Sequence, residues 1–135
     1  MKAQVKWVAD ETFIGTSESG HSIVFDTDGG KAAPTPLENI LLSLGCCSSV
    51  DVVSILKKSR QTITDCVVEI AAERVESVPR IFSDIHLHFV VTGHNISEKQ
   101  VDRAVKLSAD KYCSVALMLN KTVNITHDFE IINID

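Results

Sequence analysis

The chain has 135 residues, of which 44% are hydrophobic and 23% are charged, and its formal net charge is -5. This length and composition predict one domain over residues 1–135, with enough apolar residues for a real core. The negative charge and the lack of a Lys/Arg block argue against nucleic acid as a partner and against docking on an anionic membrane.

The amino terminus gives no sign of export. Residues 1–13 alternate polar and apolar side chains and lack the apolar run and small-residue cleavage site of a signal peptide. The uncharged apolar stretch "NILLSLGCCSSV" at residues 39–50 is too short to cross a bilayer. We therefore expect a cytoplasmic protein whose thiols are kept reduced.

The first third of the chain predicts three short strands, at residues 4–8, 12–16 and 21–27. A loop rich in Gly and Pro follows them. The next element has the clearest start signal in the sequence, with Thr35 as an N-cap, Pro36 at the first helical position and Glu38 completing a capping box.

This helix is expected to run to about residue 60. It is apolar on most of its circumference, which is typical of a central, buried helix. Such a helix needs cover on both sides, and one chain of this length supplies little. We therefore expect an intertwined homodimer in which each central helix lies partly under the other subunit.

The second half predicts a further hairpin, a helix opened by the capping box of Ser97 and Gln100, a short helical segment and a last strand. Their expected ranges are residues 65–75, 80–93, 97–109, 113–119 and 122–134. The order βββ-α-ββ-αα-β predicts an α+β fold with antiparallel strands and one long central helix.

The four cysteines show neither Cys-x-x-Cys spacing nor the density of a disulfide scaffold, so any disulfide would be transient and chemical. Cys46 and Cys47 point about 100° apart on the helix, so one of them is expected in the core. Cys47 lies too far from the helix start to gain from the dipole, and Asp51 on its face opposes ionisation. Cys47 would need a cation or hydrogen-bond donor from elsewhere in the fold to be reactive, and the alternative is a buried thiol that serves packing.

Cys113 is expected at the amino-terminal turn of the short helix, two residues after Lys111. That setting stabilises a thiolate, although a small apolar residue at a helix start is an equal alternative. Cys66, next to Asp65 at the head of a strand, has no partner in sequence and is expected to serve packing.

His86 and His88 share one face of a predicted strand, a spacing compatible with a metal pair. No carboxylate or thiol stands near them at ligand spacing, and the alternation makes them the solvated face, so we expect no metal there. The remaining histidines, including His127, are isolated. The sequence has no phosphate-binding loop, nucleophile elbow or dinucleotide motif.

Four segments in this order resemble the OsmC/Ohr family: "SGHSIVFD", "PTPLENILLSLGCCSSVDVVSIL", "IFSDIHLHFVVTG" and "YCSVAL". The resemblance covers essentially the whole chain and is closest to the YhfA-like branch of OsmC-like proteins. It implies an OsmC-like two-layer fold, a tightly intertwined homodimer, and an antioxidant, stress-response peroxidase that reduces organic hydroperoxides with thiols. It implies no metal, flavin or haem cofactor.

The resemblance places the reactive cysteine of the central helix on Cys47 and the late cysteine on Cys113, while Cys46 stands where relatives carry a glycine. It implies that Cys47 attacks the peroxide and becomes a sulfenic acid, which Cys113 converts to a disulfide. An external dithiol would reopen this bridge. Apolar walls from the helix and the partner subunit would favour organic hydroperoxides.

Two departures from the family pattern concern activation of the thiolate. Active members use an arginine of the amino-terminal strands, whereas the first arginine here is Arg60. They also use a glutamate at the helix start; Glu38 lies one residue nearer the cysteine, and the capping box explains it without catalysis. Arg74 or Arg80, from either subunit, would have to replace the cation. The alternative is a non-catalytic dimer of the same fold that senses redox state or binds a small apolar ligand.

Overall fold

A computed structural model describes all residues, 1–135. Every predicted element is present in the predicted order, and the α+β class is confirmed. The elements are β1 (Ala3–Ala9), β2 (Thr12–Ser17), β3 (Ser22–Asp26), α1 (Pro36–Lys58), β4 (Thr62–Arg74), β5 (Phe82–His94), α2 (Glu98–Leu107), the π-helical turn η1 (Ser108–Tyr112), α3 (Ser114–Leu119) and β6 (Asn124–Asn133).

The chain forms two compact units, an amino-terminal unit, Met1–Leu42, and a carboxyl-terminal unit, Ser43–Asp135. The amino-terminal unit contains the sheet β1-β2-β3, whose strands pair antiparallel through tight turns. Its apolar side chains are poorly covered: Val5 is 66% exposed, Trp7 63% and Ile23 54%. A sheet of this size cannot bury both faces by itself.

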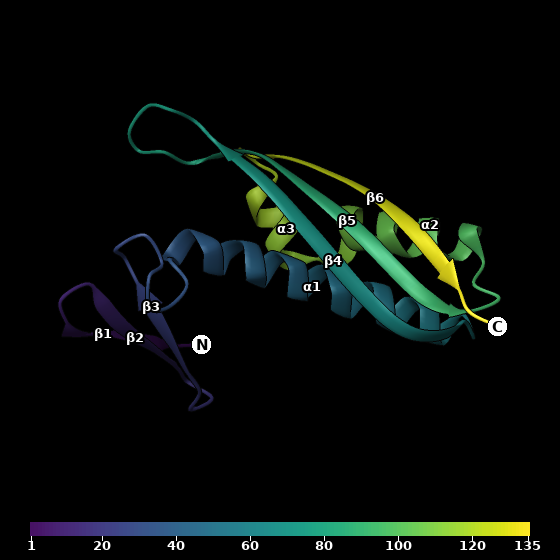
Figure 1. The fold of residues 1–135 in the computed structure, drawn as a ribbon, viewed down its shortest axis with the longest axis horizontal. Coiled ribbons are helices and arrows are strands. Elements are labelled where there is room, and N and C mark those ends of the chain that lie inside the picture. The colour runs from purple at the N-terminus through teal and green to yellow at the C-terminus, as the bar shows by residue number, and fades with distance from the viewer. The chain divides into compact units, whose positions relative to one another are not determined.

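The carboxyl-terminal unit contains the sheet β4-β5-β6 (Figure 1). β4 and β5 form an antiparallel hairpin, but β6 runs parallel to β5, so the expectation of antiparallel strands is wrong for this pair. The reason is the connection: α2, η1 and α3 carry the chain back to the end at which β5 began, as a parallel pair requires.

One face of this sheet forms the core of the carboxyl-terminal unit. β5 buries every second side chain, including Leu87 and Phe89, against the helices. From α1, Leu44, Val52 and Leu56 are completely buried in the same core. α1 is long and apolar enough to cross a membrane by length and composition, but these contacts make it a core helix.

The segment after α2 differs from the prediction of a helix through residue 109. α2 ends at Leu107, and the next five residues form a π-helical turn in which the Cys113 N–H donates to the Ser108 carbonyl at 2.9 Å. Such turns are rare and occur frequently at functional sites. Here the turn directs the buried Ser108 side chain toward α1.

The other face of the sheet carries a ladder of polar side chains. Asp128 Oδ1 is hydrogen-bonded to His86 Nε2 at 2.9 Å and to His88 Nδ1 at 2.6 Å, while Thr126 and Glu130 contact the remaining ring nitrogens. The expectation that no carboxylate lies near these histidines is therefore wrong, because the parallel pairing of β5 and β6 brings Asp128 beside them. No group of three or more His, Cys, Asp or Glu is arranged to hold a metal ion.

The ladder predicts a pH-dependent contribution to stability. Hydrogen bonds to Asp128 and then Glu130 raise the pKa of His88 above its ordinary value. Because the pKa is higher in the folded state, protonated His88 adds to the free energy of unfolding. This stabilisation is complete below about pH 6.5, the pKa in the unfolded chain, and is lost as the pH rises through the raised pKa of the folded state. Replacement of His88 by Gln should therefore lower the free energy of unfolding in urea more at about pH 5.5 than at about pH 8.5.

His21→Gln is the matched control, because His21 is an exposed histidine whose ring is hydrogen-bonded to Ser19 and not to a carboxylate. It should change stability little at either pH. An equal loss for His88→Gln at the two pH values would mean that the ionised ladder contributes nothing.

Candidate functional site

The candidate site joins two elements of the carboxyl-terminal unit, α1 with Cys47 and the start of α3 with Cys113. The Cys47 side chain is half-buried and the Cys113 side chain is completely buried. The Cys47 thiol lies close enough to the Cys113 thiol of the same chain to raise its pKa. Sequence reasoning selected both residues, and the fold brings them together.

The Cys113 sulfur is held by two donors. Cys113 is the N-cap of α3, and its Sγ accepts a hydrogen bond from the Ala116 backbone N–H at 3.4 Å. The Ser48 hydroxyl of α1 donates to the same sulfur, also at 3.4 Å. The predicted position of Cys113 at a helix start is therefore confirmed.

Of the two alternatives for Cys113, the charge state agrees with a small packed residue at a helix start and not with a stabilised thiolate. Burial raises the pKa of the Cys113 thiol, and contact with Cys47 raises it further, whereas the donors Ser48 and Ala116 lower it. The net shift is upward. Lys111 does not compensate, because its ammonium lies over the Tyr112 ring, 5.5 Å from the centroid. Cys113 is thus a protonated thiol in the resting protein.

The other two cysteines lie outside this pair. Cys46 is exposed and Cys47 is only half-buried, so the expectation that one of the adjacent cysteines lies in the core is wrong for the single chain. The residue that α1 turns toward the sheet is Gly45, which is buried against Val68 and Ile70 of β4. For Cys66, burial and the nearby Asp65 raise the pKa, which agrees with a packing role.

A small polar cluster connects α1 to the π-helical turn. The Ser108 hydroxyl donates to Asp51 Oδ2 at 3.0 Å and lies 3.4 Å from the Ser48 carbonyl oxygen. Ser48 and Ser108 are only 2% and 1% exposed. Asp51 is therefore hydrogen-bonded to Ser108. Sequence reasoning missed both serines, because a serine within a helical segment carries no signal of its own.

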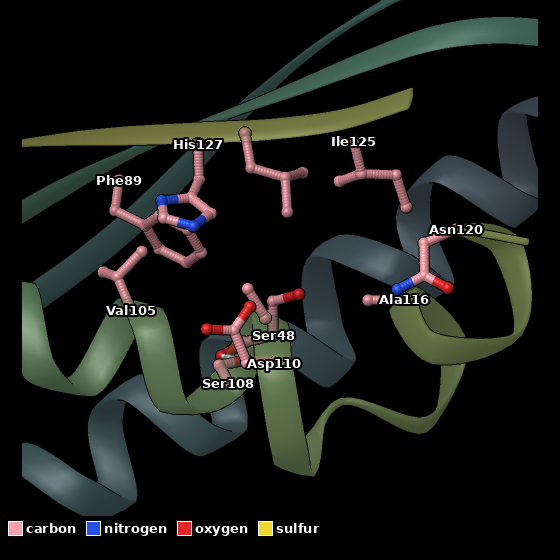
Figure 2. Close-up of a pocket in the computed structure, with 11 residues that line it drawn as sticks. Ser48, Phe89, Val105, Ser108, Asp110, Ala116, Asn120, Ile125 and His127 are labelled. Carbon is pink, nitrogen blue, oxygen red and sulfur yellow. Dashed lines mark hydrogen bonds between the residues drawn. The ribbon is translucent and has the colours of Figure 1, made fainter. Parts of the chain in front are cut away.

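Beside this cluster is a pocket of about 100 Å³ (Figure 2). Figure 2 shows the His127 imidazole on the sheet side of the pocket and Ser48, Ser108 and Asp110 on the helix side. The remaining wall is mostly apolar and consists of Leu87, Phe89, Val105, Ala109, Ala116, Asn120 and Ile125. His127, isolated in the sequence, lies on the inner face of β6 and reaches this pocket because parallel pairing sets it opposite Leu87.

Glu38 and the two candidate arginines make local contacts. Glu38 Oε1 accepts from the Thr35 N–H at 3.0 Å, and Thr35 Oγ1 accepts from the Glu38 N–H at 3.2 Å, so the capping box is confirmed. Arg74 and Arg80 hydrogen-bond to backbone carbonyls of the β4–β5 hairpin. Catalytic roles for these three residues stay predictions.

Comparison with known proteins places this architecture in one family. Residues 28–128 match the family described as OsmC-like protein. The Escherichia coli K12 protein YhfA is 54% identical over 132 residues, which is 98% of both chains. A solved structure from structural genomics has a TM-score of 0.94 and 52% identity, and covers 99% of this chain and 100% of its own.

A more distant solved structure is the organic hydroperoxide resistance protein OhrB of Bacillus subtilis. It has a TM-score of 0.63 at 15% identity over 96% of this chain and 98% of its own, a likeness that concerns the fold. The family match over most of the chain, the close relationship to YhfA and the shared fold lead to one conclusion. This chain belongs to the OsmC-like protein family.

Proposed function

We propose that this protein is a thiol peroxidase that reduces organic hydroperoxides with Cys47 and Cys113. The observation that carries the proposal is the contact between these two thiols, which come from α1 and α3 of one chain. A dithiol pair of this kind can receive two electrons from an external dithiol and deliver them to a peroxide. The name of the OhrB structure agrees with this substrate class.

The reaction consists of two displacements. The Cys47 thiolate attacks the distal oxygen of the hydroperoxide, the O–O bond breaks, and the alkoxide takes a proton and leaves as an alcohol. Cys47 is then a sulfenic acid. The Cys113 sulfur attacks the Cys47 sulfur, the S–O bond breaks, and the Cys113 proton leaves with the hydroxide as water. An external dithiol reduces the resulting disulfide by exchange.

Exposure supports this assignment of roles. Cys47 is half-buried, so a peroxide can reach it, whereas Cys113 has no exposed surface. Cys113 is also held protonated, because burial and Cys47 raise its pKa. A buried, protonated thiol is a poor first nucleophile, and its contact with Cys47 suits it to form the bridge in the second step.

We also propose that the working form is a homodimer in the cytoplasm. In one chain, only 28% of the most apolar 18-residue stretch of α1 is buried. Leu42 and Val50 of this helix are 57% and 62% exposed. The amino-terminal unit has an apolar groove of about 310 Å³ lined by Val5, Phe13 and Phe25, among others. A second copy would cover these surfaces and add apolar walls near Cys47, which would favour organic peroxides over hydrogen peroxide.

The test uses a protein in which Cys46 and Cys66 are replaced by Ser, so that only the proposed pair remains. Reduced protein is mixed with cumene hydroperoxide or with hydrogen peroxide, the free thiols are counted over time, and the peptides are mapped by mass spectrometry. A rapid Cys47–Cys113 disulfide that forms faster with cumene hydroperoxide is expected. A Cys47→Ser variant that consumes peroxide at the original rate would refute the proposal.

The second candidate function is a non-catalytic dimer that senses redox state or binds a small apolar ligand. It is favoured by the absence of any arginine before Arg60, since the thiolate then lacks the family's cation. The same experiment separates the two functions. A slow disulfide without preference for the organic peroxide, formed in a protein that does not turn over, would favour the sensor.

A further inference from the structure

The pocket beside the thiol pair contains a histidine that the two displacements do not use. We infer that Ser48 and His127 form a proton relay that deprotonates Cys113 through water held in the pocket of Figure 2. Ser48 touches the reacting sulfur, and His127 acts through Ser48 as a positioning residue. The inference rests on the proposed function, because it concerns the second displacement of that reaction.

The first link is the contact between Ser48 and Cys113. Cys113 must lose its proton before its sulfur attacks Cys47, yet its side chain has no exposed surface from which water could take it. The Ser48 hydroxyl lies 3.4 Å from the Cys113 sulfur and also lines the pocket. It is therefore the hydroxyl that connects the buried thiol with the pocket.

The second link is the pocket itself. Its volume of about 100 Å³ is well above the roughly 10–15 Å³ that a cavity needs to hold one water molecule. A buried water needs two to four polar partners, and the pocket offers the side chains of Ser48, Ser108, Asp110, Asn120 and His127. Because Asp110 and Asn120 are exposed, the pocket also leads to solvent.

The third link is His127, a group suited to take a proton near neutral pH. Figure 2 shows its imidazole across the pocket from Asp110. From the sheet and α2 the side chains that face it, Leu87, Phe89 and Val105, carry no charge, so the carboxylate of Asp110 is the charged group across the pocket. Asp51 of α1 is hydrogen-bonded to Ser108 and is not among the residues that line the pocket.

The proton balance follows from this order. The Cys113 S–H donates to the Ser48 oxygen, the Ser48 hydroxyl proton passes to water, and the water passes a proton to His127. The new Ser48 O–H then donates to the Cys113 thiolate, which is the hydrogen bond that the structure contains. The thiolate attacks Cys47, and His127 returns its proton through the pocket to the departing hydroxide or to solvent.

The experiment needs no peroxide. In the protein without Cys46 and Cys66, an equimolar amount of Ellman's disulfide reacts with Cys47 and releases one thionitrobenzoate ion. Cys113 then attacks the Cys47 sulfur of the mixed disulfide, releases the second ion and loses its proton. The two phases are followed by absorbance from about pH 5 to about pH 9, which spans the ordinary pKa of histidine.

We expect the second-phase rate of the parent protein to rise in a step with pH, as the base that accepts the Cys113 proton loses its own proton. His127→Gln should remove that step and slow the second phase by on the order of a hundredfold, with the first phase unchanged. His94→Gln is the matched control, because His94 contacts the Ile134 carbonyl at the end of the sheet, and it should change neither phase.

Two results would overturn the inference: a His127→Gln protein that keeps both the rate and the pH step, or one that slows both phases equally, which would indicate a structural effect. Ser48→Ala provides a second check and should slow only the second phase. If the second phase behaves as expected but the protein reduces no hydroperoxide, the relay stands and the peroxidase proposal fails.

Discussion

Replacement of Cys113 by Ser is expected to abolish repeated reduction of cumene hydroperoxide and to leave one turnover intact. The first displacement needs only Cys47, so one equivalent of alcohol should still form. Cys47 would then remain a sulfenic acid, because serine cannot form the disulfide. The steady-state rate with an external dithiol should fall to that of the reaction without protein, and excess peroxide should convert Cys47 to the sulfinic acid.

Mass spectrometry of the oxidised peptide and trapping of the sulfenic acid with dimedone check this result. Cys66→Ser is the matched control: Cys66 is another thiol with a raised pKa, but it is only partly buried and lies on β4. It should keep the full steady-state rate. If Cys113→Ser turns over as fast as the parent protein, an external thiol must resolve Cys47 directly, and Cys113 is not the resolving cysteine.

The second prediction concerns Gly45, which precedes the adjacent cysteines. A Cβ at this position would lie 2.6 Å from Ile70 Cδ1 and 3.3 Å from Val68 Cγ1, so glycine allows α1 to approach β4 closely. Gly45→Val should lower the free energy of unfolding by about 1–3 kcal/mol, the usual effect of overpacking. Since Cys47 is two residues away, the shift of α1 should also slow formation of the Cys47–Cys113 disulfide.

Two further variants distinguish overpacking from other effects of the substitution. Gly45→Ala adds only the Cβ, whose nearest contact is the mobile end of Ile70, and alanine is favoured over glycine in a helix by about 1 kcal/mol. It should therefore be nearly neutral. Gly45→Val combined with Ile70→Ala should recover part of the loss. Urea unfolding at constant protein concentration measures all of these, and an additive double variant would contradict the proposed contact.

The buried face of α1, which includes Gly45, determines how far each of the two adjacent cysteines is exposed. Gly45 and Ser48 belong to the buried face of α1, Cys46 is exposed, and Cys47 lies between these extremes. That intermediate position lets Cys47 contact the buried Cys113 and remain open to a peroxide. Cys46 is exposed and makes no comparable contact.

Local patterns in the sequence were sufficient to predict the secondary-structure elements, their order and the fold class. The capping box of Thr35 and Glu38, the alternation along β5 and the apolar circumference of α1 predict the elements and their order, because capping and periodicity depend on neighbours in the chain. The family resemblance selected Cys47 and Cys113, which carry a recognisable spacing. These features together predict the α+β class and the candidate pair.

Only the tertiary structure decided how distant segments meet. The parallel pairing of β6 with β5 sets His127 in the pocket and Asp128 beside two histidines, and the π-helical turn brings Ser108 to Asp51. It also reverses the expected charge preference of Cys113, because burial outweighs the donors at the helix start. Strand direction, burial and pKa depend on residues far apart in the chain, and no short stretch of sequence contains that information.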